Sequence, residues 1–119
     1  MKKIFFLIGI MSLFFLGFYN PYQGILKTSL EITIMNRLGN IVESCEVQLY
    51  GNRSDYENEE NPVAESQMTN KKGKVLFKEL ETLPYFIRAE KAVANNFGEG
   101  EMVDTLVAGR RNKVSIVIR

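Results

Sequence analysis

The sequence of 119 residues contains no histidine, no tryptophan and only one cysteine. The absence of histidine excludes Ser-His and Cys-His catalytic pairs and removes a common metal ligand. One cysteine, Cys45, cannot form an internal disulfide, so the fold must be stabilised by its hydrophobic core. Cys45 alternates with Val47 and Leu49, which predicts a buried thiol rather than a reactive one. No segment after the N-terminal run has the period of an amphipathic helix, so we predict no helix in the folded domain.

The N-terminal segment differs from the rest of the chain in composition. Lys2 and Lys3 precede fifteen uncharged residues, 4–18, in which Ser12 is the one polar side chain. A basic start followed by an apolar run is typical of a secretory signal. As a helix the run would span about 22 Å, which is less than the roughly 30 Å of a bilayer core. We therefore expect residues 1–24 to be a cleaved signal peptide, with an uncleaved membrane anchor as the alternative.

Residues 25–119 are expected to form one domain with a balanced charge. Without Lys2 and Lys3 the chain keeps 13 of its 15 basic residues against 14 acidic ones, which gives a net charge of −1. Such a balance provides no general attraction to nucleic acid or to an anionic membrane. We expect no nucleic-acid partner, and membrane contact only through the N-terminal segment if that segment is retained.

Alternating apolar residues predict strands along most of the domain. The clearest are "LEITIM" at 30–35, "SCEVQLY" at 44–50, "KVLFK" at 74–78, "YFIRAEKA" at 85–92 and "KVSIVIR" at 113–119. Weaker strands at 63–70, which we place at a sheet edge, and at 102–108 bring the count to seven. Polar turns rich in glycine and asparagine separate them. Seven short strands predict an all-β sandwich, with a closed barrel as the alternative.

A spaced motif runs through the second half of the domain. It reads T-x-x-x-G-x-V-x-F-x-x-L-x-x-x-x-Y-x-I-x-A from Thr69 to Ala89, and its central members are Gly73, Val75, Phe77, Leu80, Tyr85 and Ile87. Upstream, V-x-x-C-x-V-x-L at 42–49 follows a Gly-Asn turn. Together these motifs resemble the prealbumin-like modules of bacterial surface proteins, which include the carboxypeptidase regulatory-like domains and the collagen-adhesin B-type repeats. The resemblance implies a seven-stranded antiparallel Greek-key sandwich, prealbumin-like or Ig-like, over about residues 29–119.

The motif residues suit this fold. Gly73 is expected in a tight turn that requires φ > 0. Leu80 is expected to fill the bottom of the sandwich, and Tyr85 to bury its ring while its hydroxyl reaches loop backbone. Ser44-Cys45 departs from the family, which usually has Gly-Ala at this place.

Two oxygen-rich loops are the candidate metal sites. Loop 51–62 offers Asp55, Glu57 and Glu59, and loop 93–101 offers Glu99 and Glu101. Calcium takes about six to eight such oxygens, although neither loop has the spacing of an EF-hand. Solvated acidic loops are the alternative. Strands that alternate in direction would place the two loops at opposite ends of the sandwich, and Arg110 and Arg111 at the end that holds loop 51–62.

We expect an exported, non-catalytic binding or accessory module of the periplasm or cell surface, without a cofactor. Its ligand, an unknown protein or a carbohydrate, would bind the end loops, chiefly 51–62 and 93–101, because loops vary on a rigid scaffold. One alternative is a calcium-stabilised surface protein that assembles through strand 63–70. Another is a small hydrolase that uses carboxylates alone. The candidates for exposed aromatic side chains are Tyr56, Phe97 and Phe86, the last of which we expect to pack under a neighbouring loop.

Overall fold

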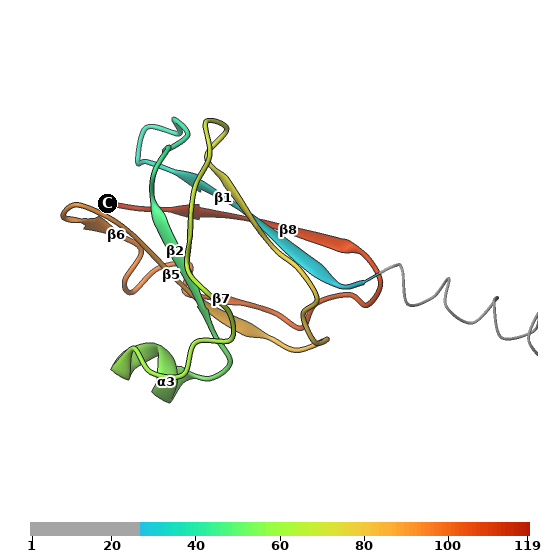
Figure 1. Ribbon diagram of the computed structural model, residues 1–119. Coiled ribbons are helices and arrows are strands. Elements are labelled where there is room, and N and C mark those ends of the chain that lie inside the picture. Colours follow the sequence, from blue (N-terminus) through green and yellow to red (C-terminus); the bar gives the residue numbers. More distant parts are fainter. Residues whose placement is uncertain (1–26) are drawn as a thin grey trace, which may run out of the picture.

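The structure is a computed structural model that describes residues 27–119, so the expected signal segment lies outside the described residues. Two sheets pack face to face (Figure 1). The smaller sheet has the order β4-β1-β8, from β1 (Ser29–Met35), β4 (Lys74–Phe77) and β8 (Arg111–Val117). The larger sheet has the order β3-β2-β5-β6, with β7 paired to β5, from β2 (Glu46–Tyr50), β3 (Gln67–Met68), β5 (Tyr85–Lys91), β6 (Ala94–Asn95) and β7 (Met102–Val103).

The core follows directly from the alternation of apolar residues along the strands. In β1, Ile32 and Ile34 are fully buried, while Thr33 between them faces away from the core. Both sheets contribute to a single buried cluster, which includes Leu30, Val47, Leu49, Val75, Phe77, Tyr85, Ile87, Ala89 and Ile116. Burial of each large side chain contributes about 1.5–3 kcal/mol. Cys45 is also fully buried, as predicted, and burial raises the pKa of its thiol to about 11, which keeps it unreactive at neutral pH.

The all-β sandwich is confirmed, but its details differ from the expectation. β1 and β8 pair in parallel, so the sandwich is not wholly antiparallel. The described part of the chain holds eight strands rather than seven, because the chain turns at Ala92 and Val93 and pairs Ala94 with Lys91 to form β6. The strand expected at 63–70 lies at a sheet edge but contains only β3, and the strand expected at 102–108 contains only β7.

The motif residues occupy the turns and walls of the sandwich. Gly73 has φ of +74°, and a Cβ there would lie 2.9 Å from Ile41 Cβ and 3.0 Å from the Ile34 carbonyl oxygen. The Tyr85 hydroxyl accepts a hydrogen bond from the Glu81 amide (3.0 Å) and donates one to the Glu81 carbonyl (3.1 Å). Ser44, which replaces the family's glycine, has φ of 59°, a conformation that glycine adopts with less strain.

The prediction that the domain contains no helix is wrong. Loop 51–62 contains α3 (Arg53–Asn58), and Asn52 caps its N-terminus by accepting a hydrogen bond from the Asp55 amide at 2.8 Å. The helix ends at Glu59, which adopts a left-handed conformation with φ of 54°. A helix of six residues is too short to show an amphipathic period, so the sequence pattern of this segment was indistinguishable from that of a loop. No helix in residues 27–119 is long and apolar enough to span a membrane.

Candidate functional site

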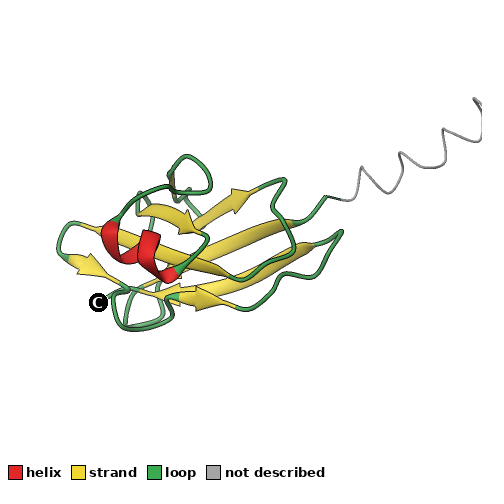
Figure 2. Ribbon diagram, turned by 90° about the horizontal axis from the view of Figure 1, so that it is seen from below, coloured by secondary structure: helices red, strands yellow, loops and turns green. Residues whose placement is uncertain are grey.

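The helix α3 covers part of the outer face of the larger sheet (Figure 2). Tyr56, which was expected to be exposed, is only 3% exposed because its ring is pressed between the helix and the sheet. The ring lies edge-on to Tyr50 at a centroid distance of 6.0 Å and tilted against Phe86 at 5.8 Å. Phe86 points outward from β5 and packs under this helix, as expected.

Arg88, on the outer face of β5, holds this arrangement together. Its guanidinium carbon lies 4.8 Å from the ring centroid of Tyr56 and 4.4 Å from that of Phe97, both within the range of cation–π attraction. Nη2 donates a hydrogen bond of 2.7 Å to the Tyr56 carbonyl. Nη1 lies 3.5 Å from Glu90 Oε1 and 4.0 Å from Glu59 Oε1. Buried Nε has no hydrogen-bond partner among residues 27–119, and the guanidinium that carries it faces two aromatic rings.

The two acidic loops meet beside β5, and the expectation that they lie at opposite ends of the sandwich is wrong. The Tyr56 hydroxyl, in the first loop, donates a hydrogen bond of 2.5 Å to Glu101 Oε2, in the second. The reason is that the chain turns at Ala92 and Val93, and then runs back along β5 through β6 and β7. The Glu101 carbonyl accepts from the Ile87 amide at 2.6 Å, in the middle of that strand.

Asn96 fixes the second loop in this position. Its side chain is 1% exposed, accepts a hydrogen bond from the Ala89 amide at 2.9 Å and donates one to the Ile87 carbonyl at 2.8 Å. The buried amide thus pairs with the backbone of β5 as a neighbouring strand would. A buried polar side chain with both groups satisfied rigidifies the segment that carries it.

The hydrogen bond between the loops changes the protonation behaviour of both partners. The pKa of Tyr56 is raised far above its ordinary value, first by burial and then by the bond to the Glu101 carboxylate. The pKa of Glu101 is lowered, chiefly because the Tyr56 hydroxyl donates to its charged form. Both shifts favour a neutral tyrosine beside an ionised glutamate across the neutral pH range.

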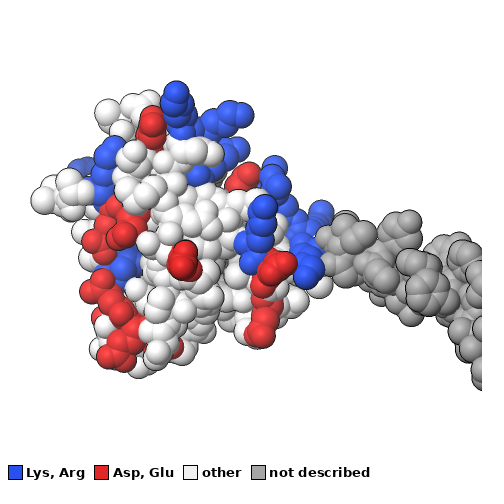
Figure 3. Space-filling view, viewed as in Figure 1, with Lys and Arg blue, Asp and Glu red and all other residues white. Residues whose placement is uncertain are grey.

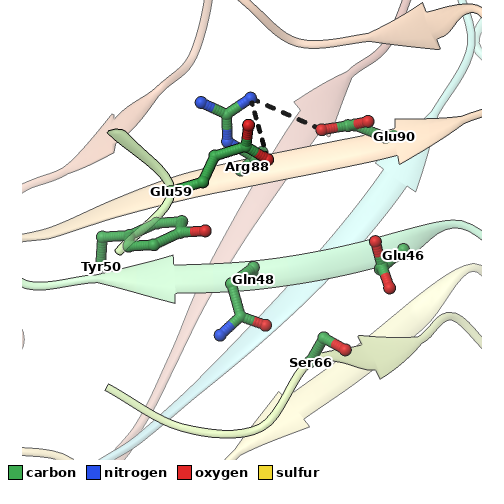
Figure 4. Close-up of a pocket in the computed structure, with 7 residues that line it drawn as sticks. All are labelled: Glu46, Gln48, Tyr50, Glu59, Ser66, Arg88 and Glu90. Atoms are coloured by element: carbon green, nitrogen blue, oxygen red, sulfur yellow. Dashed lines mark hydrogen bonds and ion pairs between the residues drawn. The ribbon is translucent and has the colours of Figure 1, made fainter. Parts of the chain in front are cut away.

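A polar groove lies next to α3 on the same face of the sheet, with a volume of about 200 Å³ (Figure 4). We call it the α3 groove, and its lining residues are Glu46, Gln48, Tyr50, Glu59, Ser66, Arg88 and Glu90. Alternate residues of β2 and β5 supply most of the lining, because every second side chain of a strand points to the same face. The Tyr50 hydroxyl points along the groove, and the residue is 4% exposed.

The five proposed calcium ligands have separate partners. Asp55 Oδ2 accepts from Asn52 at 2.9 Å. Glu57 lies 3.8 Å from Arg53, Glu99 lies 2.8 Å from Arg119, and Glu59 and Glu101 contact the groups described above. No group of three or more His, Cys, Asp or Glu side chains that could hold a metal ion occurs in the described range 27–119. Calcium binding therefore stays a prediction that nothing in this geometry supports.

Acidic and basic side chains gather on different parts of the surface. In Figure 3 most acidic side chains lie over α3 and the larger sheet, and most basic ones lie toward the opposite side and the turns. A larger hollow, of about 480 Å³, lies on the basic side. There Glu31 is already paired with Lys74 at 3.7 Å and with Arg111 at 3.6 Å. Arg111 was expected at the end that holds loop 51–62, but the residue it pairs with is Glu31 of β1.

Sequence reasoning did not identify the residues that build the α3 groove. Arg88 was taken as an ordinary outward residue of a strand, and Asn96 as part of a polar loop. A local signal existed for α3, since Asn52 is a preferred N-cap residue and Asp55 places an acidic side chain in the first turn. The contacts of Arg88 and Asn96 have no such signal, because they join segments that are distant in the sequence.

Comparison with known proteins supports the fold. No protein-family model and no curated protein matches the sequence. Among solved structures, the TIE protein of Bacillus anthracis matches 78% of this chain with 18% identity and a TM-score of 0.56, over 16% of its own length. BcpA, the major pilin subunit of Bacillus cereus, matches 78% of this chain with 14% identity and a TM-score of 0.54, over 30% of its length.

The chain thus spans less than a third of either of these proteins. Identities this low indicate a shared fold and no more. The shared fold is a two-sheet β-sandwich, which is consistent with the resemblance of the sequence motifs.

Proposed function

We propose that this chain is an exported, non-catalytic β-sandwich module of the bacterial envelope, and that it binds its partner in the α3 groove. The connectivity would be a variant of the Greek-key prealbumin-like arrangement. The observation that carries the binding role is the docking of α3 over the larger sheet. The buried cluster of Tyr50, Tyr56 and Arg88 gives the groove a rigid wall, and preorganised polar groups are what a binding site requires.

Export is supported by the sequence before the domain and by one structural neighbour. Lys2, Lys3 and the apolar residues 4–18 have the layout of a secretory signal, whether it is cleaved or retained as an anchor. The neighbour from Bacillus cereus is a major pilin subunit, and a subunit of that kind is consistent with a place at the cell surface. The periplasm is the alternative location.

A non-catalytic role is supported by the chemistry of the candidate residues. The chain contains no histidine, and a carboxylate hydrolase would need two acidic groups at one pocket. Glu57 and Glu59 are each near a different arginine, and Glu99 and Glu101 likewise have different partners. None of these pairs presents two unpaired carboxylates to a common cavity, and two of the three carboxylates of the α3 groove, Glu59 and Glu90, are paired with Arg88.

Export is tested by fractionation of bacterial cells that express the full chain with a C-terminal epitope tag. We expect the tag in the envelope or outside the cell, and recovery of the tag in the cytoplasm alone would refute the export part of the proposal. The intact mass of the recovered protein distinguishes the two forms, because loss of residues 1–24 identifies a cleaved signal.

The binding role is tested separately by thermal unfolding against peptidoglycan fragments, polysaccharides and peptides. A ligand that binds only the folded state raises its stability by RT ln(1 + [L]/Kd). We expect a ligand of the groove to lose its effect in a Gln48→Ala variant, since Gln48 lines the centre of the groove. A ligand whose effect is unchanged in that variant binds elsewhere on the molecule.

A further inference from the structure

The α3 groove brings two carboxylates of the same charge into opposite positions. Glu46 on β2 is the direct register partner of Glu90 on β5. Like charges at directly opposite positions of an antiparallel pair destabilise a sheet. A third carboxylate, Glu59, enters the groove from the end of α3 (Figure 4). This arrangement costs stability unless a cation lies among the three side chains.

Arg88 does not supply enough positive charge for the three carboxylates. Its nearest carboxylate oxygens are those of Glu90 and Glu59, at 3.5 and 4.0 Å, and its planar group is held between two rings. The Glu46 carboxylate has no ion-pair or hydrogen-bond partner within the described part of the chain, since residue 46 bonds only through its backbone. The lining of the groove therefore carries three negative charges against one positive charge.

An independent observation concerns the Tyr50 hydroxyl. The side chain is buried, its hydroxyl points into the groove, and no protein group in residues 27–119 bonds to it. The ring is buried while the hydroxyl oxygen is accessible from the groove, so the side chain presents an unpaired hydroxyl to a ligand or a water there. Gln48 adds an acceptor, because its amide nitrogen already donates to the Ala64 carbonyl at 2.6 Å and its side-chain oxygen has no donor in the described residues.

We infer that the α3 groove binds a primary ammonium group carried on an alkyl chain, such as a lysine side chain of a partner polypeptide or the end of a polyamine. Carboxylates and carbonyl oxygens only accept hydrogen bonds, whereas an ammonium only donates them, three at a time. Glu46 and Glu90 would accept from the ammonium on either side, and Tyr50, four positions along β2 from Glu46, would accept from the ligand farther along the groove. This inference rests on the proposed binding role of the groove.

The size of the groove agrees with a ligand of this kind. Its volume of about 200 Å³ is below the roughly 300–1,000 Å³ of sites for drug-sized molecules. It suits one side chain better than an oligosaccharide. A calcium ion would require about six to eight oxygen ligands, whereas a single ammonium requires three acceptors.

The test is an NMR titration of the full chain in non-ionic detergent micelles, with backbone amides of residues 46–50 and 86–90 as reporters. The probes are the end-blocked peptide Ala-Lys-Ala, the neutral peptide Ala-Gln-Ala, spermidine and chitotriose. We expect shifts at the reporters with the lysine peptide, with spermidine or with both, and none with the glutamine peptide. The affinity should fall as salt is added.

Two variants connect the binding to the named groups. Glu46→Gln with Glu90→Gln keeps the shape of the side chains, and we expect it to weaken cation binding by about fivefold or more. Tyr50→Phe removes only the hydroxyl and should weaken binding by a smaller factor. Glu65→Gln, an exposed carboxylate that does not line the groove, is the matched control and should leave the affinity unchanged.

Each result decides a specific point. Shifts with the lysine peptide alone identify a polypeptide side chain, and shifts with spermidine alone identify a polyamine, so both outcomes support the inference. Shifts at the reporters with chitotriose but with neither cation overturn the ammonium inference and leave the proposed binding role intact. The absence of any shift at the reporters overturns the inference and also removes the groove from the proposed function. Equal binding by the double variant and by the control likewise overturns the inference.

Discussion

The two outer faces of this sandwich are built from the same alternation of residues, yet they have different structures. On the smaller sheet, outward residues of β8 such as Lys113 and Ser115 are exposed, and Glu31 is paired with cations of neighbouring strands. On the larger sheet, Tyr50 and Arg88 occupy equivalent outward positions and are covered by α3. An outward position in a strand therefore becomes part of a site when another segment of the chain covers it.

The outer face of the larger sheet, which α3 covers, depends more on tertiary contacts than the exposed outer face of the smaller sheet. Isolated helices shorter than about 12–15 residues are marginal in water, and α3 has six residues. Its cap at Asn52 and its ion pair between Arg53 and Glu57 contribute about 1 kcal/mol and less than 1 kcal/mol respectively. The helix must therefore be held mainly by the burial of Tyr56.

Tyr56→Ala should convert the covered face of the larger sheet into an exposed one. We expect a loss of about 3 kcal/mol in the free energy of unfolding, because a fully buried aromatic ring is removed. Val117→Ala, at an exposed position on the other face, should change stability by about 0.5 kcal/mol or less. Urea denaturation of the full chain in micelles measures both values. A loss under about 1 kcal/mol for Tyr56→Ala would mean that α3 is not docked in solution.

Arg88→Met should weaken the contact between the two loops without removing a ring. We expect a loss of about 1–2 kcal/mol, from two cation–π contacts and the hydrogen bond to the Tyr56 carbonyl. The matched change Arg111→Met breaks an exposed ion pair with Glu31 and should cost about 0.5 kcal/mol. The same denaturation experiment compares them, and equal losses would show that Arg88 has no special role.

The bond between Tyr56 and Glu101 should make the covered face more sensitive to pH than the exposed face. The pKa of Glu101 is lowered in the folded state, so its contribution is complete above its ordinary value of 4.5 and is lost as the pH falls through the folded value. The pKa of Tyr56 is raised, so its contribution is lost as the pH rises above its ordinary value of 10.0. Tyr56→Phe should cost about 1 kcal/mol at neutral pH.

The stability difference between the parent chain and Tyr56→Phe should narrow at both ends of the pH range. Unfolding free energies measured between acid and alkaline pH give this difference directly. Ser115→Ala, on the exposed face, is the control, and its effect should not vary with pH because no titratable group in the described residues bonds to it. A constant difference for Tyr56→Phe would contradict the bond between the loops.

Calcium should have the smallest effect. Since the five candidate carboxylates have separate partners, about 5 mM calcium should shift the unfolding temperature by less than about 1 °C. A larger shift that disappears in Glu99→Gln/Glu101→Gln but not in Glu31→Gln would restore the calcium hypothesis. Glu31 lies on the opposite face and serves as the matched carboxylate.

The arrangement of the core could be predicted from the sequence because it depends on a local rule. Leu30, Ile32 and Ile34 alternate with polar residues, and this alternation alone specifies which face of β1 is buried. Gly73 and Tyr85 were recognisable for the same reason, since the turn and the hydroxyl contact involve residues close in the sequence. The parallel pairing of β1 with β8 was not predictable in this way, because it joins the two ends of the domain.

The α3 groove depends on contacts between segments that are distant in the sequence. Glu57, Glu59 and Glu101 were recognised as polar and acidic, but their partners were not. The regular alternation of β5 predicts that Arg88 faces outward. It does not specify that Tyr56, 32 residues earlier, and Phe97, nine residues later, will place their rings against its guanidinium. The assumption of alternating strands even placed these loops apart, because a two-residue β6 cannot be foreseen from composition.

A β-sandwich with one buried thiol, no histidine chemistry and a balanced charge follows from the residue types and their period along the chain. Long-range packing brings the two loops together over β5, places Arg88 over the rings of Tyr56 and Phe97, and sets Glu46 opposite Glu90 in a groove. The physical reason is that burial of an outward side chain requires a covering segment. The position of that segment is set by the packing of the whole chain.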